Sequence, residues 1–307
     1  AAQVMLAVSV GNLAEPIIRY DDYPALLAQP EGFWIKTLTE GRWLNYLWHL
    51  RGVVTPAWLN FALYQLLWAA IATAIACAAT SGNDRRWFTV VLMLALLPTP
   101  PVLLMAPWSN TVIPGFAVLA LFGWLALYLP QRRLRLPLPP FTLAAFAAYT
   151  TFPIILFVIC LISTRSRSLR DLLALMLLFA ASLAMAVLMI YAVNWQVHGV
   201  FGIQLDPRRS PDLARDLPAM IAHLPLLRET FTVLINKLSF HSGAMQLFHA
   251  VLLVLATAVL LRHNRLEALY LWCAMLTGLA LMVLQVLKLG SPSRYVPSIS
   301  PGSSMPS

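Results

Sequence analysis

Long apolar runs separated by short polar loops dominate this chain. Several of the runs contain no charged side chain and reach the length of a membrane-spanning helix, which is about 20 residues. They are Trp58–Thr80, Val112–Leu129, Leu172–Val193, Met245–Leu261 and Ala268–Leu287. The pattern therefore predicts an all-α, polytopic transmembrane protein.

The polar stretch between residues 11 and 56 follows a different pattern. Its apolar side chains recur at roughly helical spacing among charged ones: Phe33, Leu38, Trp43, Leu44, Leu47 and Trp48. This spacing predicts a helix that lies along the membrane interface and does not cross it.

The two ends of the sequence differ from its middle. The apolar run Ala1–Val10 is too short to span a bilayer, so we expect a fragment whose first span is cut. Residues 298–307 are polar and are expected to form a disordered tail. Because no repeat recurs at a fixed period, residues 1–307 are predicted to form a single polytopic membrane domain.

Arginines concentrate in short loops, which set the predicted orientation. These loops are residues 81–87, 131–136, 163–170 and 262–267, and the positive-inside rule places them in the cytoplasm. One span cannot join two loops on the same side. The run 137–162, interrupted near Tyr149, is therefore either a re-entrant hairpin of two half-helices or one kinked span whose loop breaks the charge rule. With the hairpin, all the long polar segments lie on the external face.

Composition narrows the class of protein. Hydrophobic residues make up 60% of the chain and charged residues 11%, against roughly 45–50% and about 25% in soluble domains. A soluble fold could not bury so much apolar surface. The net charge of +9 comes mainly from loops beside apolar runs, so it indicates orientation in a lipid bilayer and not binding to nucleic acid.

Two adjacent carboxylates, Asp21 and Asp22, follow the first apolar run. A carboxylate there is suited to act as a general base that takes the proton from an attacking hydroxyl. The alternative is structural: Asp22 caps a short helix that has Pro24 in its first turn.

Two arginines are candidate phosphate ligands. Arg42 is followed by Trp43, so a guanidinium for phosphate and an aromatic face for a sugar or headgroup stand side by side. Arg294 follows the last span and is expected on the same external face as the acidic pair. The alternative for both arginines is that of interfacial anchors.

Other signatures are missing from the sequence. The histidines show no metal-binding spacing, and the three cysteines lie far apart in apolar runs, so no metal site is predicted. There is no nucleotide-binding or hydrolase motif, and no predicted span carries a central charge for a proton relay. No cofactor is predicted.

The acidic pair Asp21-Asp22, the later Gly41-Arg42-Trp43-Leu44 and the series of spans together resemble the Gtr-type bacterial glucosyltransferases of the GT-C superfamily. Tyr149 in the broken run and the late Arg294 are similar to further features of that family. The resemblance covers most of the chain, although only the two short motifs are specific. Tyr23-Pro24 and Tyr149-Thr150 depart from the family pattern and leave the donor sugar and the role of Tyr149 open.

The resemblance implies a GT-C-like fold and a glycosyltransferase in the bacterial inner membrane, with its active site facing the periplasm. The implied donor is a polyprenyl-phosphate-linked sugar such as undecaprenyl phosphate glucose, and the acceptor is a surface glycan such as O-antigen, as in lipopolysaccharide modification. Asp21 or Asp22 would be the base, with Asp21 slightly favoured. Arg42 and Arg294 would hold the donor phosphate.

The resemblance leaves a divalent metal ion at the acidic pair as an open alternative. A transporter or flippase of lipid-linked sugars is the main competing function, since it needs the same phosphate contacts, although such proteins often show two repeated halves. A structural subunit that anchors a partner is the third.

Overall fold

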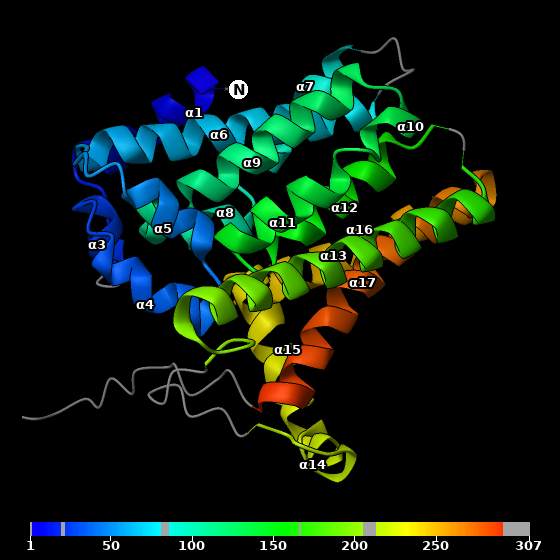
Figure 1. Ribbon diagram of the computed structural model, residues 1–307. Coiled ribbons are helices and arrows are strands. Elements are labelled where there is room, and N and C mark those ends of the chain that lie inside the picture. The colour runs from blue at the N-terminus through cyan, green and yellow to red at the C-terminus, as the bar shows by residue number, and fades with distance from the viewer. Residues whose placement is uncertain (1, 20–21, 81–85, 166, 205–212, 291–307) are drawn as a thin grey trace, which may run out of the picture. The chain divides into compact units, whose positions relative to one another are not determined.

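The computed structural model describes residues 2–19, 22–80, 86–165, 167–204 and 213–290. Every regular element in these ranges is a helix (Figure 1). The chain divides into two compact units: unit 1 comprises residues 1–205 and 257–274, and unit 2 comprises residues 206–256 and 275–307. The predicted all-α class is confirmed, whereas the single-domain organisation stays a prediction.

The helices of the first 205 residues are α1 (Ala2–Val8), α2 (Val10–Ala14), α3 (Tyr23–Leu26), α4 (Glu31–Glu40), α5 (Trp43–His49), α6 (Ala57–Ala79), α7 (Arg86–Leu96), α8 (Pro100–Met105), the 3-10 turn η2 (Ala106–Trp108), α9 (Ser109–Tyr128), α10 (Gln131–Leu134), α11 (Leu138–Ala148), α12 (Phe152–Ser163) and α13 (Leu169–His198). The later helices are α14 (Leu217–Ala222), α15 (Leu224–Leu238), α16 (Gly243–His263) and α17 (Arg265–Leu289).

Five helical segments in the described residues are long and apolar enough to cross a membrane: α6, Val102–Tyr128, α13, α16 and α17. They coincide with the five apolar runs of the sequence, so the predicted long apolar helices are confirmed, while their passage through a membrane stays a prediction. Several of their apolar side chains face outward: Leu177 on α13 is 71% exposed and Leu247 on α16 is 66% exposed. Such exposure suits contact with lipid and would be unfavourable in water.

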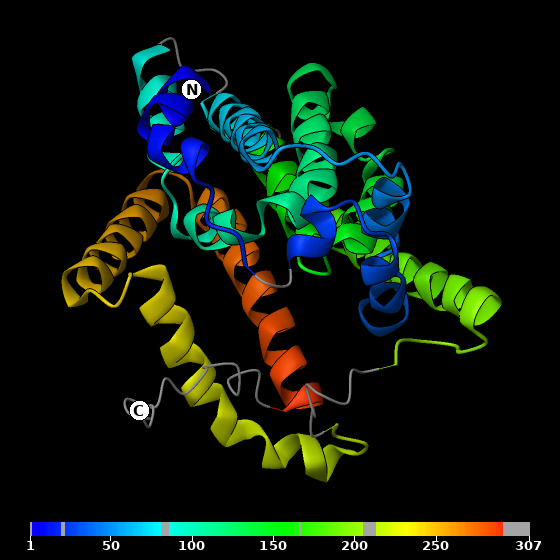
Figure 2. The same cartoon turned by 90° about the vertical axis from the view of Figure 1, so that its left-hand side faces the viewer.

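Small residues let α6 and α9 approach closely at the centre of unit 1. The two helices lie side by side in both ribbon views (Figures 1 and 2). Ala74 of α6 is buried, and a Cβ added at Gly123 of α9 would lie 3.0 Å from its methyl group. Close packing of small side chains is the usual basis of helix association in membranes, because lipid tails leave little hydrophobic driving force between helices.

The run 137–162 forms two short helices and not one span. α11 and α12 pack against each other, and the helical conformation is interrupted between Ala148 and Phe152. The segments that flank the pair lie together, because Arg135 donates a 2.7 Å hydrogen bond to Asp171. The prediction of two half-helices is therefore confirmed, and one kinked span does not fit, because both ends of the pair lie together. The re-entrant position of the pair in a membrane stays a prediction. α11 has 11 residues and, at 1.5 Å per residue, is about half as long as a bilayer core is thick.

The amphipathic stretch forms two helices, so the prediction of one helix is corrected. α4 ends at Gly41, whose φ of 72° places it in the left-handed region that glycine adopts without strain. α5 then begins at Trp43. The turn between them presents Arg42 and Trp43 to the rest of unit 1. An interfacial location for these helices stays a prediction.

The tip of the hairpin presses against α9 at Gly115. A Cβ there would lie 2.3 Å from the Phe152 ring and 3.0 Å from the Ala148 methyl group. We expect Gly115→Ala to lower the free energy of unfolding by about 1–3 kcal/mol, because overpacking outweighs the better helix propensity of alanine. Denaturation of the purified protein in detergent measures the change.

Gly278→Ala in α17 is the matched control, since no described atom beyond its chain neighbours and its own helix backbone lies within 4 Å of the added Cβ. That substitution should leave the protein equally or slightly more stable, by up to about 1 kcal/mol. Equal stability of both variants would contradict the close contact at Gly115.

Candidate functional site

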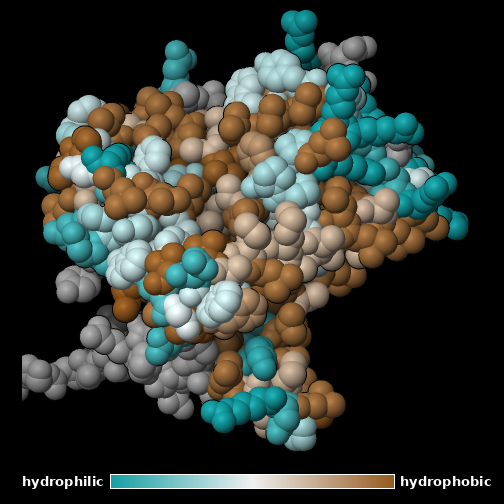
Figure 3. Space-filling model, in the orientation of Figure 1, coloured by the Kyte–Doolittle hydropathy of each residue, from teal (hydrophilic) through white to brown (hydrophobic). Residues whose placement is uncertain are grey.

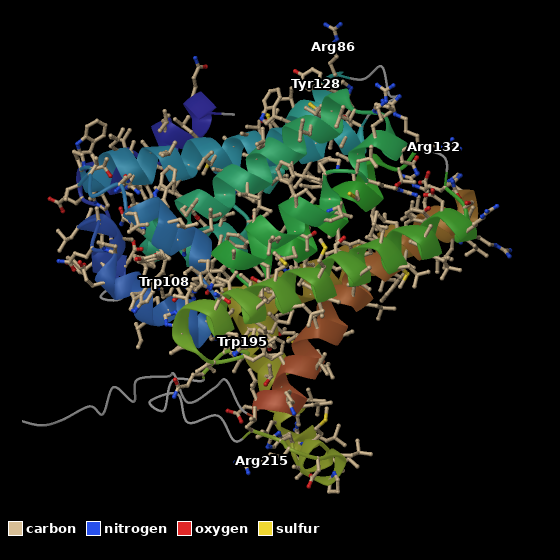
Figure 4. All side chains as sticks on the ribbon, viewed as in Figure 1. Arg86, Trp108, Tyr128, Arg132, Trp195 and Arg215 are labelled. Atoms are coloured by element: carbon tan, nitrogen blue, oxygen red, sulfur yellow. The ribbon has the colours of Figure 1, made fainter. Side chains whose placement is uncertain are left out.

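Unit 1 has two chemically different ends. Figure 4 places Arg86, Tyr128 and Arg132 at one end and Trp108 and Trp195 at the other. The first end carries described residues of the predicted cytoplasmic loops, among them Arg86, Arg132 and Arg167, and we call it the arginine end. The second end holds the described members of the predicted site, and we call it the site end. The positive-inside pattern therefore agrees with the fold of this unit.

At the site end, Asp22 is completely buried and its carboxylate accepts four hydrogen bonds. Oδ2 accepts from the backbone N–H of Asn110 at 3.1 Å and from its side-chain amide at 2.6 Å. Oδ1 accepts from the backbone N–H of Thr111 at 2.7 Å and from its hydroxyl at 2.6 Å. Both donor residues belong to the first turn of α9, whose N–H groups have no intrahelical acceptor. Asp22 thus caps α9 from a distant part of the chain.

The same cap continues into α6. The side-chain amide of Asn60 donates a 2.7 Å hydrogen bond to Oδ1 of Asn110, and Oδ1 of Asn60 accepts one of 2.6 Å from Thr55. Asn60 and Asn110 are buried. The network therefore joins the segment before α3, the start of α6 and the start of α9.

These contacts correct the alternative prediction that Asp22 caps the short helix that follows it. Asp22 does precede α3, but its carboxylate makes no hydrogen bond to that helix. The helix that it caps is α9. Burial raises the pKa of the Asp22 carboxyl above its ordinary value, and the four hydrogen bonds oppose that rise.

The surroundings of Asp22 do not fit a metal ion. A carboxylate has about four lone-pair sites, and four donors already point at those of Asp22. Within the described ranges, no three His, Cys, Asp or Glu side chains gather where they could hold a metal.

Arg42 and Tyr149 come together from distant parts of the sequence. The guanidinium carbon of Arg42 lies 4.5 Å from the centre of the Tyr149 ring. Arg42 also forms an ion pair with Glu40, and both side chains are mostly buried. Tyr149 sits at the break between α11 and α12, where its ring stacks on Phe152 at 5.2 Å. The structure thus brings two predicted site residues into direct contact.

Trp43 points toward the end of α13. Its indole N–H donates a 2.7 Å hydrogen bond to Oδ1 of the buried Asn194. Around it lies an aromatic cluster formed with Trp34, Tyr46 and His198, whose ring centres are 4.6–6.1 Å apart in the contacting pairs. Trp34 is 40% exposed, so the cluster has an accessible aromatic edge.

The inner face of α5 carries two buried polar side chains. The side-chain amide of Asn45 donates a 3.3 Å hydrogen bond to the carbonyl oxygen of Ala148. This backbone carbonyl is open to a side-chain donor because α11 ends at Ala148. His49 stacks on Phe33 with ring centres 4.4 Å apart. Burial, with smaller contributions from Arg51 and Lys36, lowers the pKa of His49 to about 4, so its ring is neutral at pH 7.

A chain of contacts connects Asp22 with Arg42. Thr111 holds Asp22, and Gly115, one helical turn further along α9, abuts Phe152. Phe152 stacks on Tyr149, over which Arg42 lies. Asp22, Trp43, Arg42 and Tyr149 therefore share one end of unit 1, while Asp21 and Arg294 lie outside the described residues.

Sequence reasoning missed several partners at this end. They are Glu40, Asn60, Asn110, Thr111, Asn194 and His198. Asn110 and Thr111 are uncharged residues in no recognisable motif, and a sequence alone does not reveal which distant carboxylate a helix start will bind. The ion pair of Glu40 was easier to foresee, because the residue lies two positions before Arg42.

Comparison with models of known families, with curated proteins and with solved structures gives no match. Over the residues it describes, the structure defines a helical protein with five helices long and apolar enough to cross a membrane, and with a polar, aromatic-rich cluster at one end of unit 1.

We expect Asp22→Asn to lower the free energy of unfolding by about 3 kcal/mol, because its amide would face donors of α9 that need an acceptor. Chemical denaturation in detergent measures this change. Asp216→Asn is the matched control: Asp216 caps α14 at an exposed position through a 2.9 Å hydrogen bond from the N–H of Ala219. Since Asn caps as well as Asp, little change is expected there. An Asp22→Asn variant as stable as the unmodified protein would refute the anchoring role.

Proposed function

We propose that this protein is a membrane glycosyltransferase. It transfers a sugar, glucose by the family resemblance, from a polyprenyl-phosphate donor to a surface glycan such as O-antigen, at the periplasmic face of the bacterial inner membrane. The observation that carries the proposal is the contact of Arg42 with Tyr149, next to Glu40 and opposite the arginine end. Two residues selected for this chemistry from the sequence lie side by side in the fold.

The contact suits recognition of a phosphate. A guanidinium that rests on an aromatic ring keeps its edge N–H groups available for oxygen atoms of a phosphate. Glu40 holds Arg42 in place when no phosphate is bound. In the proposed reaction, Arg42 stabilises the negative charge that develops on the departing polyprenyl phosphate.

We assign the general base to Asp21. The oxygens of Asp22 are already occupied by donors from α9, so Asp22 is the anchor of the segment that carries its neighbour. The acceptor hydroxyl attacks the anomeric carbon of the sugar and the bond from that carbon to the phosphate oxygen breaks. Asp21 takes the hydroxyl proton, and the polyprenyl phosphate leaves with the bonding electron pair.

The aromatic cluster supports a sugar at this end of unit 1. Trp34 and Trp43 offer ring faces and edges, and the hydrogen bond from Trp43 to Asn194 fixes one of them. Aromatic side chains provide much apolar contact and keep a polar atom for hydrogen bonding, which matches the mixed surface of a sugar.

The decisive assay is transfer of radiolabelled sugar from undecaprenyl phosphate glucose to surface glycan, in membranes that contain the protein. We expect Asp21→Asn to reduce transfer by about 100-fold or more, since it removes the base. Glu31→Gln is the matched control, because it neutralises an acidic residue in the same polar segment, at the exposed start of α4.

The same membranes separate transfer from transport. If the unmodified protein transfers no sugar but moves the lipid-linked sugar across the bilayer, and Asp21→Asn moves it equally well, the transporter alternative replaces the proposal. If Asp21→Asn transfers sugar normally, the assignment of the base is wrong.

Arg42→Lys should raise the KM for the lipid-linked donor by about tenfold, because lysine loses both the bidentate contact and the flat face that rests on Tyr149. Steady-state kinetics with varied donor measure the effect. Arg51→Lys is the matched control: Arg51 also lies over an aromatic ring, that of Trp48 at 4.7 Å, but outside the cluster. An equal change of KM in both variants would contradict a specific role for Arg42.

A further inference from the structure

The arginine end of unit 1 contains a second candidate binding site. A cavity of about 500 Å³ lies there, lined by Arg132, Arg167, Ser168, Arg170, Asp171 and Ala174. Half of the lining residues are arginines, and the cavity lies where α10 meets the start of α13. None of these residues takes part in the function proposed above.

The acidic groups near this cavity already have basic partners. Asp171 accepts from Arg135 at 2.7 Å and also from Gln131 and Tyr270 at 2.8 and 3.2 Å. Glu267 pairs with Arg167 at 2.5 Å. Each carboxylate is thus neutralised by one arginine.

Positive charge is therefore left over in the cavity. Among the described residues, neither Arg132 nor Arg170 forms an ion pair. The Nε of Arg167 is buried and has no hydrogen-bond acceptor among the described residues. Guanidinium groups that still have N–H donors without an acceptor favour an anionic ligand with several oxygen atoms. A phosphate matches their geometry best.

The surface next to the cavity is apolar. Leu173 and Leu177 follow it along α13, and their side chains are 58% and 71% exposed. Figure 3 shows hydrophilic side chains gathered at the end where α10 lies and a hydrophobic band that continues along α13. A free phosphate ion would gain nothing from this band, whereas the acyl chains of a lipid would pack against it.

We propose that this cavity binds the phosphate headgroup of an anionic phospholipid of the surrounding bilayer. Arg132, Arg167 and Arg170 contact the phosphate, and the acyl chains lie along Leu173 and Leu177 of α13. Basic pockets between helices at the cytoplasmic surface are suited to such headgroups, because anionic lipids are concentrated in that leaflet. The lipid would join α10, which leads into the hairpin, to the start of α13.

The first test uses the unmodified protein. It is placed in nanodiscs of mixed phosphatidylglycerol and phosphatidylcholine, released into the gas phase, and the retained lipids are identified by native mass spectrometry. We expect phosphatidylglycerol to be retained at least about tenfold in preference to phosphatidylcholine. Equal retention of the two lipids would overturn the proposal, whatever the variants do.

The second test compares two double variants with the same loss of charge. Arg132→Gln with Arg170→Gln removes two ligands of the cavity, and the preference for phosphatidylglycerol should fall by about tenfold. Arg86→Gln with Arg262→Gln removes two basic residues of other predicted cytoplasmic loops, and the preference should persist. An equal loss in both double variants would mean a general surface attraction and would overturn the site.

A third arm separates a lipid from a phosphate ion. Inorganic phosphate is added to the detergent-purified protein in competition with phosphatidylglycerol. We expect no displacement of the lipid, since the ion lacks acyl chains. Displacement at matched concentration would make the cavity an anion site and would overturn the assignment to a lipid.

Discussion

The burial of one carboxylate at the start of α9 is the constraint on which the site end of unit 1 depends. The first turn of a helix leaves N–H groups without acceptors, and in an apolar environment such groups are costly. Asp22 satisfies two of them and two side-chain donors as well. Because Asn110 also binds Asn60, the same cluster sets the distance between α6 and α9 at this end. The segment that carries the acidic pair is thereby fixed to the two central helices.

The break in the hairpin supplies the second half of the site. Had residues 137–162 formed one continuous helix, Tyr149 would lie in its middle and its backbone would be paired within the helix. The break leaves the carbonyl of Ala148 open to Asn45 and brings the Tyr149 ring to a tip that Arg42 can reach. Irregular backbone of this kind is stable at depth only when protein surrounds it. α5 and α9 provide that surrounding, and Gly115 makes room for it.

The sequence was sufficient for features that depend on local pattern. The length of the apolar runs identified the five long helices. Two arginine-rich loops predicted on the same side of the membrane, with one apolar run between them, indicated the hairpin. Gly41 is a residue type that commonly ends a helix, and here it separates α4 from α5. The regular spacing of apolar residues on both sides of Gly41 nevertheless predicted one continuous helix. Prolines 98, 100 and 101 likewise divide the apolar run after Arg86 into α7 and α8.

Features that depend on contacts between residues far apart in the sequence could not be predicted from the sequence. Asp22 has the same residue type and spacing whether it serves as a base or as an anchor, and only the position of α9 distinguishes the two. The same holds for Trp43, whose partner Asn194 lies 151 positions away.

The two ends of unit 1 handle charge in opposite ways, and this difference bears on the proposed function. At the arginine end, cations exceed acids and several are exposed, which costs little near water and lipid headgroups. At the site end, Arg42 is mostly buried and already paired with Glu40. A phosphate that binds Arg42 must therefore compete with a carboxylate, so the gain from binding is smaller than at an unpaired arginine. In a transferase this is an advantage, because ground-state binding that is too tight would slow release of the polyprenyl phosphate. In the proposed reaction, Arg42 would be held by Glu40 and the Tyr149 ring. It would be positioned for the charge that increases as the sugar–phosphate bond breaks.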